Sequence, residues 1–339
     1  MIILFYIFVS LIVLSILVMI HEFGHFIMAK ISGTKVNEFS IGFGPRLFVK
    51  KYGDTEYSFR ILLFGGYCAL AGEDEKSNDR RAVTNQPWYI RLGIFAAGPL
   101  MNIAMTFVLL FLVFYIVGSP IPTVKTVMEG YPAQKAGILP GDKIVMVNDT
   151  KINDWNSLEN IINSNNGVEL KFTIKRDNIT LTKNIVPNYD KKASKPMIGI
   201  IPQYERSIYL AIKIGIQQTI YFSKMIIASL YMLVSGKVSA NDLMGPVGIV
   251  QAVGTVARTG FLNLMTFAAL ISVNLGLFNL LPFPALDGGR ILFVIIEGLR
   301  GKPVDPEKEG FVHYIGFILL IALMLFATYR DLIRINIFK

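Results

Sequence analysis

The most constraining feature of this chain is an uncharged apolar run that leads directly into three ionisable residues. Residues 1–20 contain no Lys, Arg, Asp or Glu, and the pentapeptide HEFGH follows at 21–25. About 20 apolar residues suffice for a helix to cross a hydrocarbon core of ~30 Å. Because ionisable side chains are costly at membrane depth, such a cluster points to a functional site. The sequence therefore predicts a site within a lipid bilayer or at its edge.

The spacing of the two histidines suits a metal ion. Residues four apart share one face of an α-helix, so His21 and His25 can both bind one Zn²⁺ at ~2.0–2.1 Å. Glu22 stands beside the first ligand and can act as base on a zinc-bound water. The alternatives are a chance match and a pair of interfacial histidines. The longer pattern HExxHxxGxxH is absent, since Met28 and Ile31 occupy its later positions, so a third ligand must lie elsewhere.

Composition agrees with a membrane protein. The 339 residues are 53% hydrophobic, and the mean hydropathy is +0.51, well above that of soluble domains. We interpret the net charge of +9 as basic loops that face anionic lipid, and we expect no nucleic-acid partner. The single cysteine, Cys68, excludes an intrachain disulfide and is expected to be an inert apolar residue. Residues 1–20 lack a basic n-region, so they are not interpreted as a removable signal peptide.

Four membrane spans are predicted, over about 2–28, 90–117, 261–281 and 311–329. The segment 208–234 is also apolar, but Lys213, Lys224 and two glutamines interrupt it. We interpret it as an amphipathic helix on the membrane or against the core, in preference to a fifth span.

The distribution of basic residues predicts the orientation of the spans. Ten Lys and Arg residues lie between positions 30 and 91, and four more lie between 290 and 308. Both loops should be cytoplasmic by the positive-inside rule. The first and third spans then run from outside to inside, and HEFGH lies toward the cytoplasmic leaflet. A third ligand is expected near the end of the third span.

That end reads NLLPFPALDGG over 279–289. Two prolines stop a regular helix and the glycine pair permits a tight turn, so the backbone breaks at membrane depth. The break presents Asp287 at the depth expected for the histidines. Asp287 could equally be the N-cap of a following helix. Glu297 and His313 are the competing third ligands, but both lie nearer a loop.

The motifs HEFGH and NLLPFPALDGG together resemble the site-2 protease family of intramembrane zinc metalloproteases. The bacterial branch with a PDZ domain, the regulator-of-sigma-E protease type, is the most similar. The resemblance extends nearly end to end, through FSIGFGPRLF at 39–48, LLFGGYCALAGE at 62–73, AAGPLMN at 96–102 and MGPVGIV at 244–250.

The resemblance implies a role for each motif residue. It implies that His21, His25 and Asp287 bind Zn²⁺ and that Glu22 is the catalytic base. It also implies that Asn274 and Asn279 line the active site, with Asn279 the better candidate to stabilise the oxyanion.

A polar, turn-rich stretch over 120–202 is interpreted as an inserted α+β domain. Strands are predicted at 123–127, 143–147, 169–175 and 179–185, with a helix at 157–163. The segment 131–144, YPAQKAGILPGDKI, is similar to PDZ domains of bacterial proteases. The domain should lie outside the cytoplasm, where it either binds a peptide or acts only as a size filter.

The segment between the first two spans holds two glycine pairs. Phe43 stands between Gly42 and Gly44, and strand-forming residues over 57–70 surround Gly65 and Gly66. In the resembled family these regions are a membrane-dipping loop and a β-hairpin beside the active site. Cleavage of a transmembrane helix requires unwinding, and a hairpin edge can pair with the freed backbone. We therefore expect these four glycines to belong to a substrate clamp, although a hairpin that only covers the site is the alternative.

The predicted fold is an α-helical polytopic membrane protein with four transmembrane helices, an inserted α+β PDZ domain and a membrane-associated β-hairpin. Residues 1–119 and 203–339 form the membrane core, and residues 120–202 form the PDZ domain. The resemblance implies a protease of the bacterial inner membrane that cuts single-pass proteins, such as anti-sigma factors or signal-peptide remnants. A zinc-binding scaffold acting through the PDZ domain would have no need of Glu22. A zinc transporter should carry ionisable residues in more of its spans.

Overall fold

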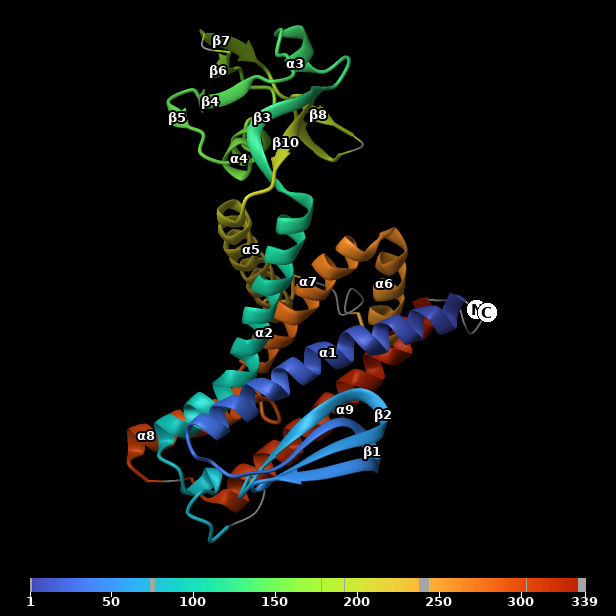
Figure 1. Cartoon of the computed structure of the whole chain (residues 1–339), viewed down its shortest axis with the longest axis vertical. Coiled ribbons are helices and arrows are strands. Elements are labelled where there is room, and N and C mark those ends of the chain that lie inside the picture. The colour runs from blue at the N-terminus through green and yellow to red at the C-terminus, as the bar shows by residue number, and fades with distance from the viewer. Residues whose placement is uncertain are drawn as a thin grey trace. The chain divides into compact units, whose positions relative to one another are not determined.

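The computed structural model describes residues 2–73, 77–177, 179–191, 193–237, 244–302 and 304–334. The chain forms two compact units (Figure 1). One unit, here the helical unit, comprises residues 1–111 and 215–339. The other, here the sheet unit, comprises residues 112–214.

Four helices in the described part of the chain are long and apolar enough to cross a membrane. They are α1 (Ile2–Ile31), α2 (Trp88–Val117), α7 (Phe261–Asn279) and α9 (Pro306–Arg334). The four predicted spans are thus confirmed as helices, with ends that differ by a few residues. The predicted amphipathic segment is also a helix, α5 (Ile208–Val234), and it is not among the four.

The helices that surround the site pack closely at glycines. A Cβ on Gly24 of α1 would lie 2.4 Å from the carbonyl oxygen of Ala97 in α2. A Cβ on Gly276 of α7 would lie 2.7 Å from the carbonyl oxygen of Pro99, also in α2. Small residues let helix backbones approach where lipid provides no hydrophobic drive. Helix α2 therefore lies in backbone contact with both neighbours.

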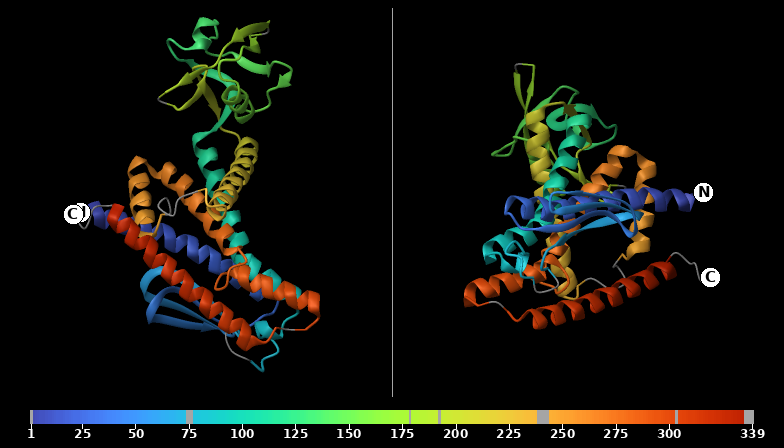
Figure 2. Two further views of the ribbon diagram at one scale, coloured as in Figure 1. Left: turned by 180° about the vertical axis from the view of Figure 1, so that it is seen from behind. Right: turned by 60° about the horizontal axis from the view of Figure 1, so that its bottom comes forward.

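Two long strands, β1 (Val36–Tyr52) and β2 (Thr55–Leu70), form a hairpin beside α1 (Figures 1 and 2). The hairpin doubles back on itself. Residues 36–41 pair with 66–70, residues 38–41 also pair with 56–59 on their other side, and residues 48–52 pair with 55–59. The result is a small sheet in which residues 66–70 form one edge and residues 48–52 the other. The strand expected over 57–70 is confirmed.

The separate membrane-dipping loop expected at Gly42 and Gly44 is wrong, because these residues belong to β1. Phe43 pairs with Leu62 in the ladder. Both glycines have positive φ angles, of 86° and 83°, which let the strand bend without steric cost. A glycine pair therefore marked a bend within a strand and not a loop.

The sheet unit contains a five-strand path with the order β10-β3-β4-β6-β7. The strands are β3 (Ser119–Val127), β4 (Lys143–Val147), β6 (Leu170–Arg176), β7 (Ile179–Ile185) and β10 (Ile200–Glu205). Short strands β5 (Thr150–Lys151), β8 (Asn188–Asp190) and β9 (Lys195–Met197) and helices α3 (Pro132–Lys135) and α4 (Trp155–Ser164) complete it. The predicted strands and helix are confirmed. Buried apolar side chains of the strands and α4 form the core.

A buried ion pair fixes the turn that leads into β4. Asp142 is fully buried and receives two bonds from the Arg176 guanidinium, at 2.7 and 2.8 Å, and one from the Leu139 N–H. Burial alone would raise the pKa of Asp142, but these bonds outweigh it and lower that pKa. Asp142, within the PDZ-like segment 131–144 of the sequence, thus has a structural role in the sheet unit.

Candidate active site

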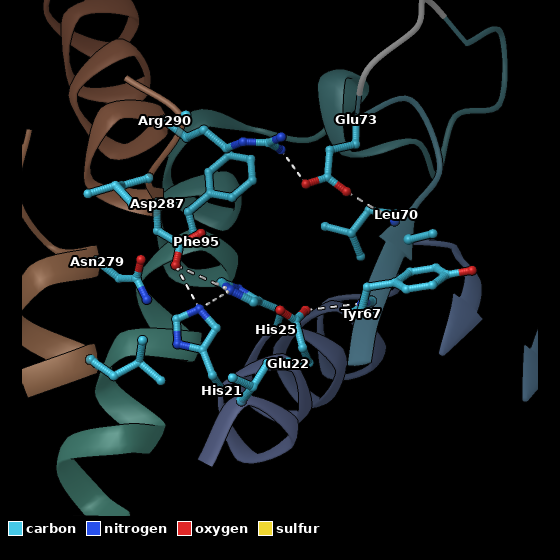
Figure 3. A pocket seen from close by; sticks show the side chains of 16 residues that line it. His21, Glu22, His25, Tyr67, Leu70, Glu73, Phe95, Asn279, Asp287 and Arg290 are labelled. Carbon is cyan, nitrogen blue, oxygen red and sulfur yellow. Dashed lines mark hydrogen bonds and ion pairs between the residues drawn. The ribbon is translucent and has the colours of Figure 1, made fainter. Parts of the chain in front are cut away.

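Three side chains from two helices converge on one point in the helical unit. Nε2 of His21 lies 3.2 Å from Nε2 of His25, and one carboxylate oxygen of Asp287 lies 2.9 and 3.4 Å from these nitrogens (Figure 3). Both histidines are buried, with 7% and 8% exposure. A tetrahedral ion with bonds of ~2.0–2.1 Å separates its ligand atoms by about 3.3 Å. The donor set and its spacing therefore fit a zinc ion.

The ring of His25 is oriented by the backbone of α2. Its Nδ1 lies 2.8 Å from the carbonyl oxygen of Ile94, which can only accept a hydrogen bond. The proton is therefore on Nδ1, and Nε2 presents its lone pair toward His21 and Asp287. Metal-binding histidines commonly have such a partner on the second nitrogen.

The ring of His21 has a corresponding partner in Asn102. This asparagine is fully buried in α2, and its amide lies 3.2 Å from His21 Nδ1. Its nitrogen is assigned to that contact, while Oδ1 has no hydrogen-bond partner among the described residues. The two amide atoms are interchangeable by a flip. A metal on Nε2 requires a proton on Nδ1, so the amide oxygen belongs opposite His21.

Gly98 of α2 leaves room for an ion. A Cβ built on Gly98 would lie 2.3 Å from Nε2 of His25 and 2.9 Å from Nε2 of His21. Any side chain here would thus occupy the space toward which both ligand nitrogens point. Glycine in a helix interior costs about 0.5–1 kcal/mol relative to alanine, and this cradle accounts for its presence.

A broken segment between α7 and α8 (Asp287–Arg300) delivers Asp287. Ala285 has a positive φ of 73°, and its N–H donates to Nδ1 of His313 at 2.9 Å. A Cβ on Gly288 would lie 2.1 Å from the carbonyl oxygen of Leu281. The prolines and glycines therefore build a compact turn.

The competing candidates for the third ligand have other roles in the structure. Helix α8 has Leu286 as its N-cap and no side-chain cap, and Asp287 points to the histidines. Glu297 pairs with Arg91 at 2.6 Å, and His313 accepts the bond from Ala285.

Glu22 lies one residue after His21 and faces the hairpin. Its Oε2 accepts a hydrogen bond of 3.0 Å from the backbone N–H of Cys68, which lies in the edge segment of the hairpin, residues 66–70. The Cys68 side chain is buried, and burial together with Glu22 and Glu73 raises the pKa of its thiol. Cys68 therefore stays protonated, which agrees with its expected inertness.

A pocket of about 570 Å³ opens beside the three converging side chains. Glu22, Asn279 and the edge residues 67–70 help to line it, and Asn279 points toward His21 and Asp287 (Figure 3).

The other residues expected to touch substrate lie outside this lining. Asn274 is not part of the lining, and its Oδ1 has no partner among the described residues. The four glycines at 42, 44, 65 and 66 also lie outside it. A Cβ on Gly66 would lie 2.3 Å from the carbonyl oxygen of Ser40, so close strand packing accounts for this residue.

Several residues of the site were missed from the sequence. Asn102 and Gly98 lie in the AAGPLMN motif, where a polar residue inside an apolar span was a usable signal. Glu73 and Arg290 line the pocket and form an ion pair (Figure 3). Their pairing joins positions 217 residues apart, and no local pattern could have shown it.

Comparison with known proteins matches nearly the whole chain. The model of peptidase family M50 matches residues 9–323. A protein of Clostridium acetobutylicum named as a zinc metalloprotease is 40% identical over 331 residues, covering 97% of this chain and 98% of its own. The regulator of sigma-W protease RasP of Bacillus subtilis is 32% identical, with 96% and 97% covered.

Part of the chain is also similar to a solved structure. The PDZ domain of an SdrC-like protein from Listeria innocua is 30% identical, with a TM-score of 0.22, covering 26% of this chain and 96% of that one. The family match and the relatives extend over both units and include every residue of the site. The chain belongs to peptidase family M50, the site-2 protease family.

Proposed function

We propose that this protein is an intramembrane zinc metalloprotease that cleaves single-pass membrane proteins. The observation that carries the proposal is the convergence of His21, His25 and Asp287 on one point, with Glu22 adjacent and a pocket beside them. A purely structural zinc site has four protein ligands, whereas a catalytic site has three and leaves one position open. Three ligands beside a carboxylate and a pocket match the catalytic arrangement.

The residues of the site have separable tasks. His21, His25 and Asp287 hold the zinc ion, which when bound polarises a carbonyl and lowers the pKa of water to ~7. Glu22 accepts a proton from the attacking water and returns it to the leaving amine. Asn279 directs its amide into the pocket, where it can donate to the oxygen of the scissile carbonyl as charge develops.

The edge segment 66–70 suits the binding of an extended substrate. It pairs with residues 36–41 on one side, and residues 67–70 face the pocket on the other. The scissile carbonyls of a helix are engaged in intrahelical bonds, so a substrate must unwind before cleavage. Addition of the unwound segment as a strand gives its backbone new partners. We therefore assign the substrate clamp to this edge, which includes Gly66 but not Gly42, Gly44 or Gly65.

Orientation and partners follow from the basic loops and from the relatives. The charge distribution supports an active site toward the cytoplasm and a sheet unit outside it, in a bacterial inner membrane. The sheet unit is assigned as a PDZ domain, which binds a peptide or filters substrates by size. The name of the Bacillus relative, regulator of sigma-W protease, supports regulators of sigma factors as substrates.

The decisive experiment replaces the base and leaves the metal ligands. Glu22→Gln is nearly isosteric and should keep zinc, while turnover of a tagged single-pass substrate in detergent should fall by ~10²–10⁴-fold. Asp287→Asn and His21→Ala should instead lose most of the zinc in elemental analysis. Cleavage by Glu22→Gln at the wild-type rate would contradict the mechanism, and full zinc retention by Asp287→Asn would contradict the ligand assignment.

A further inference from the structure

Two backbone N–H groups of the edge segment are already bound to carboxylates. The Cys68 N–H donates to Glu22 Oε2 at 3.0 Å, and the Leu70 N–H donates to Glu73 Oε2 at 3.2 Å. Residues two apart in a strand direct their N–H groups to the same side. Both of these groups therefore point away from the paired strand and toward the pocket.

An added substrate strand would need these same two donors. It would place backbone carbonyl oxygens two residues apart opposite the Cys68 and Leu70 N–H groups. The carboxylate oxygens of Glu22 and Glu73 therefore occupy the positions of substrate carbonyls. Unpaired strand edges attract other chains, and proteins commonly cover them.

Glu73 is held in place by a second contact. Its other carboxylate oxygen, Oε1, forms an ion pair with the Arg290 guanidinium (Figure 3). Arg290 lies three residues after Asp287 in α8, and its guanidinium lies 5.5 Å from the centre of the Phe95 ring. Glu73 thus joins the substrate edge to the helix that carries a metal ligand.

We infer that Glu73 is a positioning residue. Its carboxylate occupies the place of a substrate carbonyl opposite the Leu70 N–H and must be displaced before a substrate strand can bind along residues 66–70. The inference rests on the proposed protease function and on strand addition to residues 66–70. Only a segment that offers free carbonyl groups in an extended conformation can replace the Glu73 carboxylate. A stable helix cannot do so, because its carbonyls are engaged. Glu73 therefore discriminates between substrates by how easily they unwind.

Kinetics of the full-length, zinc-loaded protein in detergent test this inference. Two single-pass substrates are compared, one with a poly-Leu span and one with Gly and Pro near the cleavage position. Glu73→Ala should lower KM for the poly-Leu substrate about tenfold, the effect of removing one charge-assisted hydrogen bond, with kcat within about twofold. The Gly-Pro substrate should gain less. Glu73→Gln keeps an acceptor for Leu70 but loses the ion pair, so its KM should be intermediate.

The matched control is Glu56→Ala in the same hairpin. Glu56 pairs with Arg46 at 3.2 Å and does not line the pocket, so both substrates should keep their wild-type KM. Hydrogen–deuterium exchange of residues 66–70 gives a readout independent of cleavage. The Leu70 amide should exchange faster in Glu73→Ala than in wild type.

The outcomes separate this inference from the proposed function. An unchanged or higher KM in Glu73→Ala at wild-type zinc content would overturn the role of Glu73 and leave the protease assignment intact. If Glu73→Ala loses zinc, Glu73→Gln decides, and an unchanged KM in that variant overturns the inference. An unchanged exchange rate at Leu70 also overturns it. A wild-type protein that cuts neither substrate would instead contradict the proposed function.

Discussion

At the scale of single residues, the candidate zinc site depends as much on α2 as on the three proposed ligands. The carbonyl of Ile94 and the amide of Asn102 each engage the second ring nitrogen of one histidine. These contacts decide which nitrogen carries the proton and thus which one can bind a metal. None of the three proposed ligands lies in α2, yet that helix contacts the rings of two of them.

Gly98→Ala should therefore reduce zinc binding, although it replaces none of the proposed ligands. The added Cβ would lie 2.3 Å from Nε2 of His25, a separation that real side chains do not adopt, so the imidazole must move. Zinc content measured by elemental analysis should fall to a small fraction of the wild-type value, and cleavage should fall with it. The result would be contradicted by a Gly98→Ala protein that retains one zinc per chain.

Gly93→Ala is the matched control, since it makes the same change five residues earlier in α2. Its Cβ would meet only the flexible end of Met28, at 2.9 Å. This side chain can shift at little cost, so zinc content and cleavage should stay near wild type. A loss of zinc in both variants would indicate a general effect on α2.

At the scale of elements, the hairpin contains a polar network that the sequence did not reveal. The Glu38 side chain is buried between the paired segments and receives hydrogen bonds from Ser58 at 2.5 Å and from Arg60 and Arg46 at 2.7 Å. Ser58 and Arg60 lie in β2, and Arg46 lies in β1 beyond the bend at Gly42 and Gly44. The network therefore ties together segments that the unusual register brings side by side.

Local sequence signals predicted most helices and strands, but they could not predict how distant segments pair. Charge depletion identified the four long helices, and the alternation and turn residues identified the strands of the sheet unit, because both signals are local. The strand 57–70 was predicted, but its pairing with two partners was not, since the bend at Gly42 and Gly44 decides it. HEFGH was predicted as a metal motif from its spacing, whereas Asp287 remained either a ligand or an N-cap until the family resemblance favoured a ligand, and the structure brings the three residues together. Asn102, Gly98 and Glu73 depend on which helix or strand lies opposite, which no single segment encodes.

The hairpin network predicts a dependence of stability on pH. Burial alone would raise the pKa of Glu38, but hydrogen bonds from Ser58, Arg60 and Arg46 outweigh it and lower that pKa from 4.5 to about 2. A carboxyl with a depressed pKa stabilises the folded state above its unfolded pKa. That contribution, at most about 3 kcal/mol, is lost as the pH falls from about 4.5 toward about 2.

Thermal unfolding of wild type and Glu38→Gln in detergent measures this effect. The wild type should be more stable at pH 6, and its advantage should shrink steadily below about pH 4.5. Glu56→Gln is the control, because Glu56 lies in the same hairpin with a side chain that is 37% exposed, and it should change stability little. An advantage of the wild type that persists undiminished at pH 2 would refute the assignment.

At the scale of the whole molecule, the sheet unit is inserted through a single pair of neighbouring strand ends. Ser119 at the start of β3 pairs with Glu205 at the end of β10. Helix α2 ends at Val117, and α5 begins at Ile208, so both connections to the insertion are short. The residues that converge on the candidate zinc site, the base and the lining of its pocket all belong to the helical unit. The chemistry and the insertion are therefore separable in the chain.

Replacing residues 119–205 with a short Gly-Ser linker should accordingly leave the zinc site intact. Paired residues of neighbouring strands lie about 5 Å apart, so a linker of two to four residues can join α2 to α5. The shortened protein should keep about one zinc per chain and cut a substrate with a minimal extracytoplasmic tail within about threefold of the wild-type rate. Loss of zinc would show that the helical unit requires the insertion.

A second substrate with a folded extracytoplasmic domain then separates the two roles of the sheet unit. If the unit is a size filter, only the shortened protein should cut this substrate. If the unit binds peptide, the shortened protein should cut neither substrate faster than wild type, and KM for the substrate that carries the recognised peptide should rise.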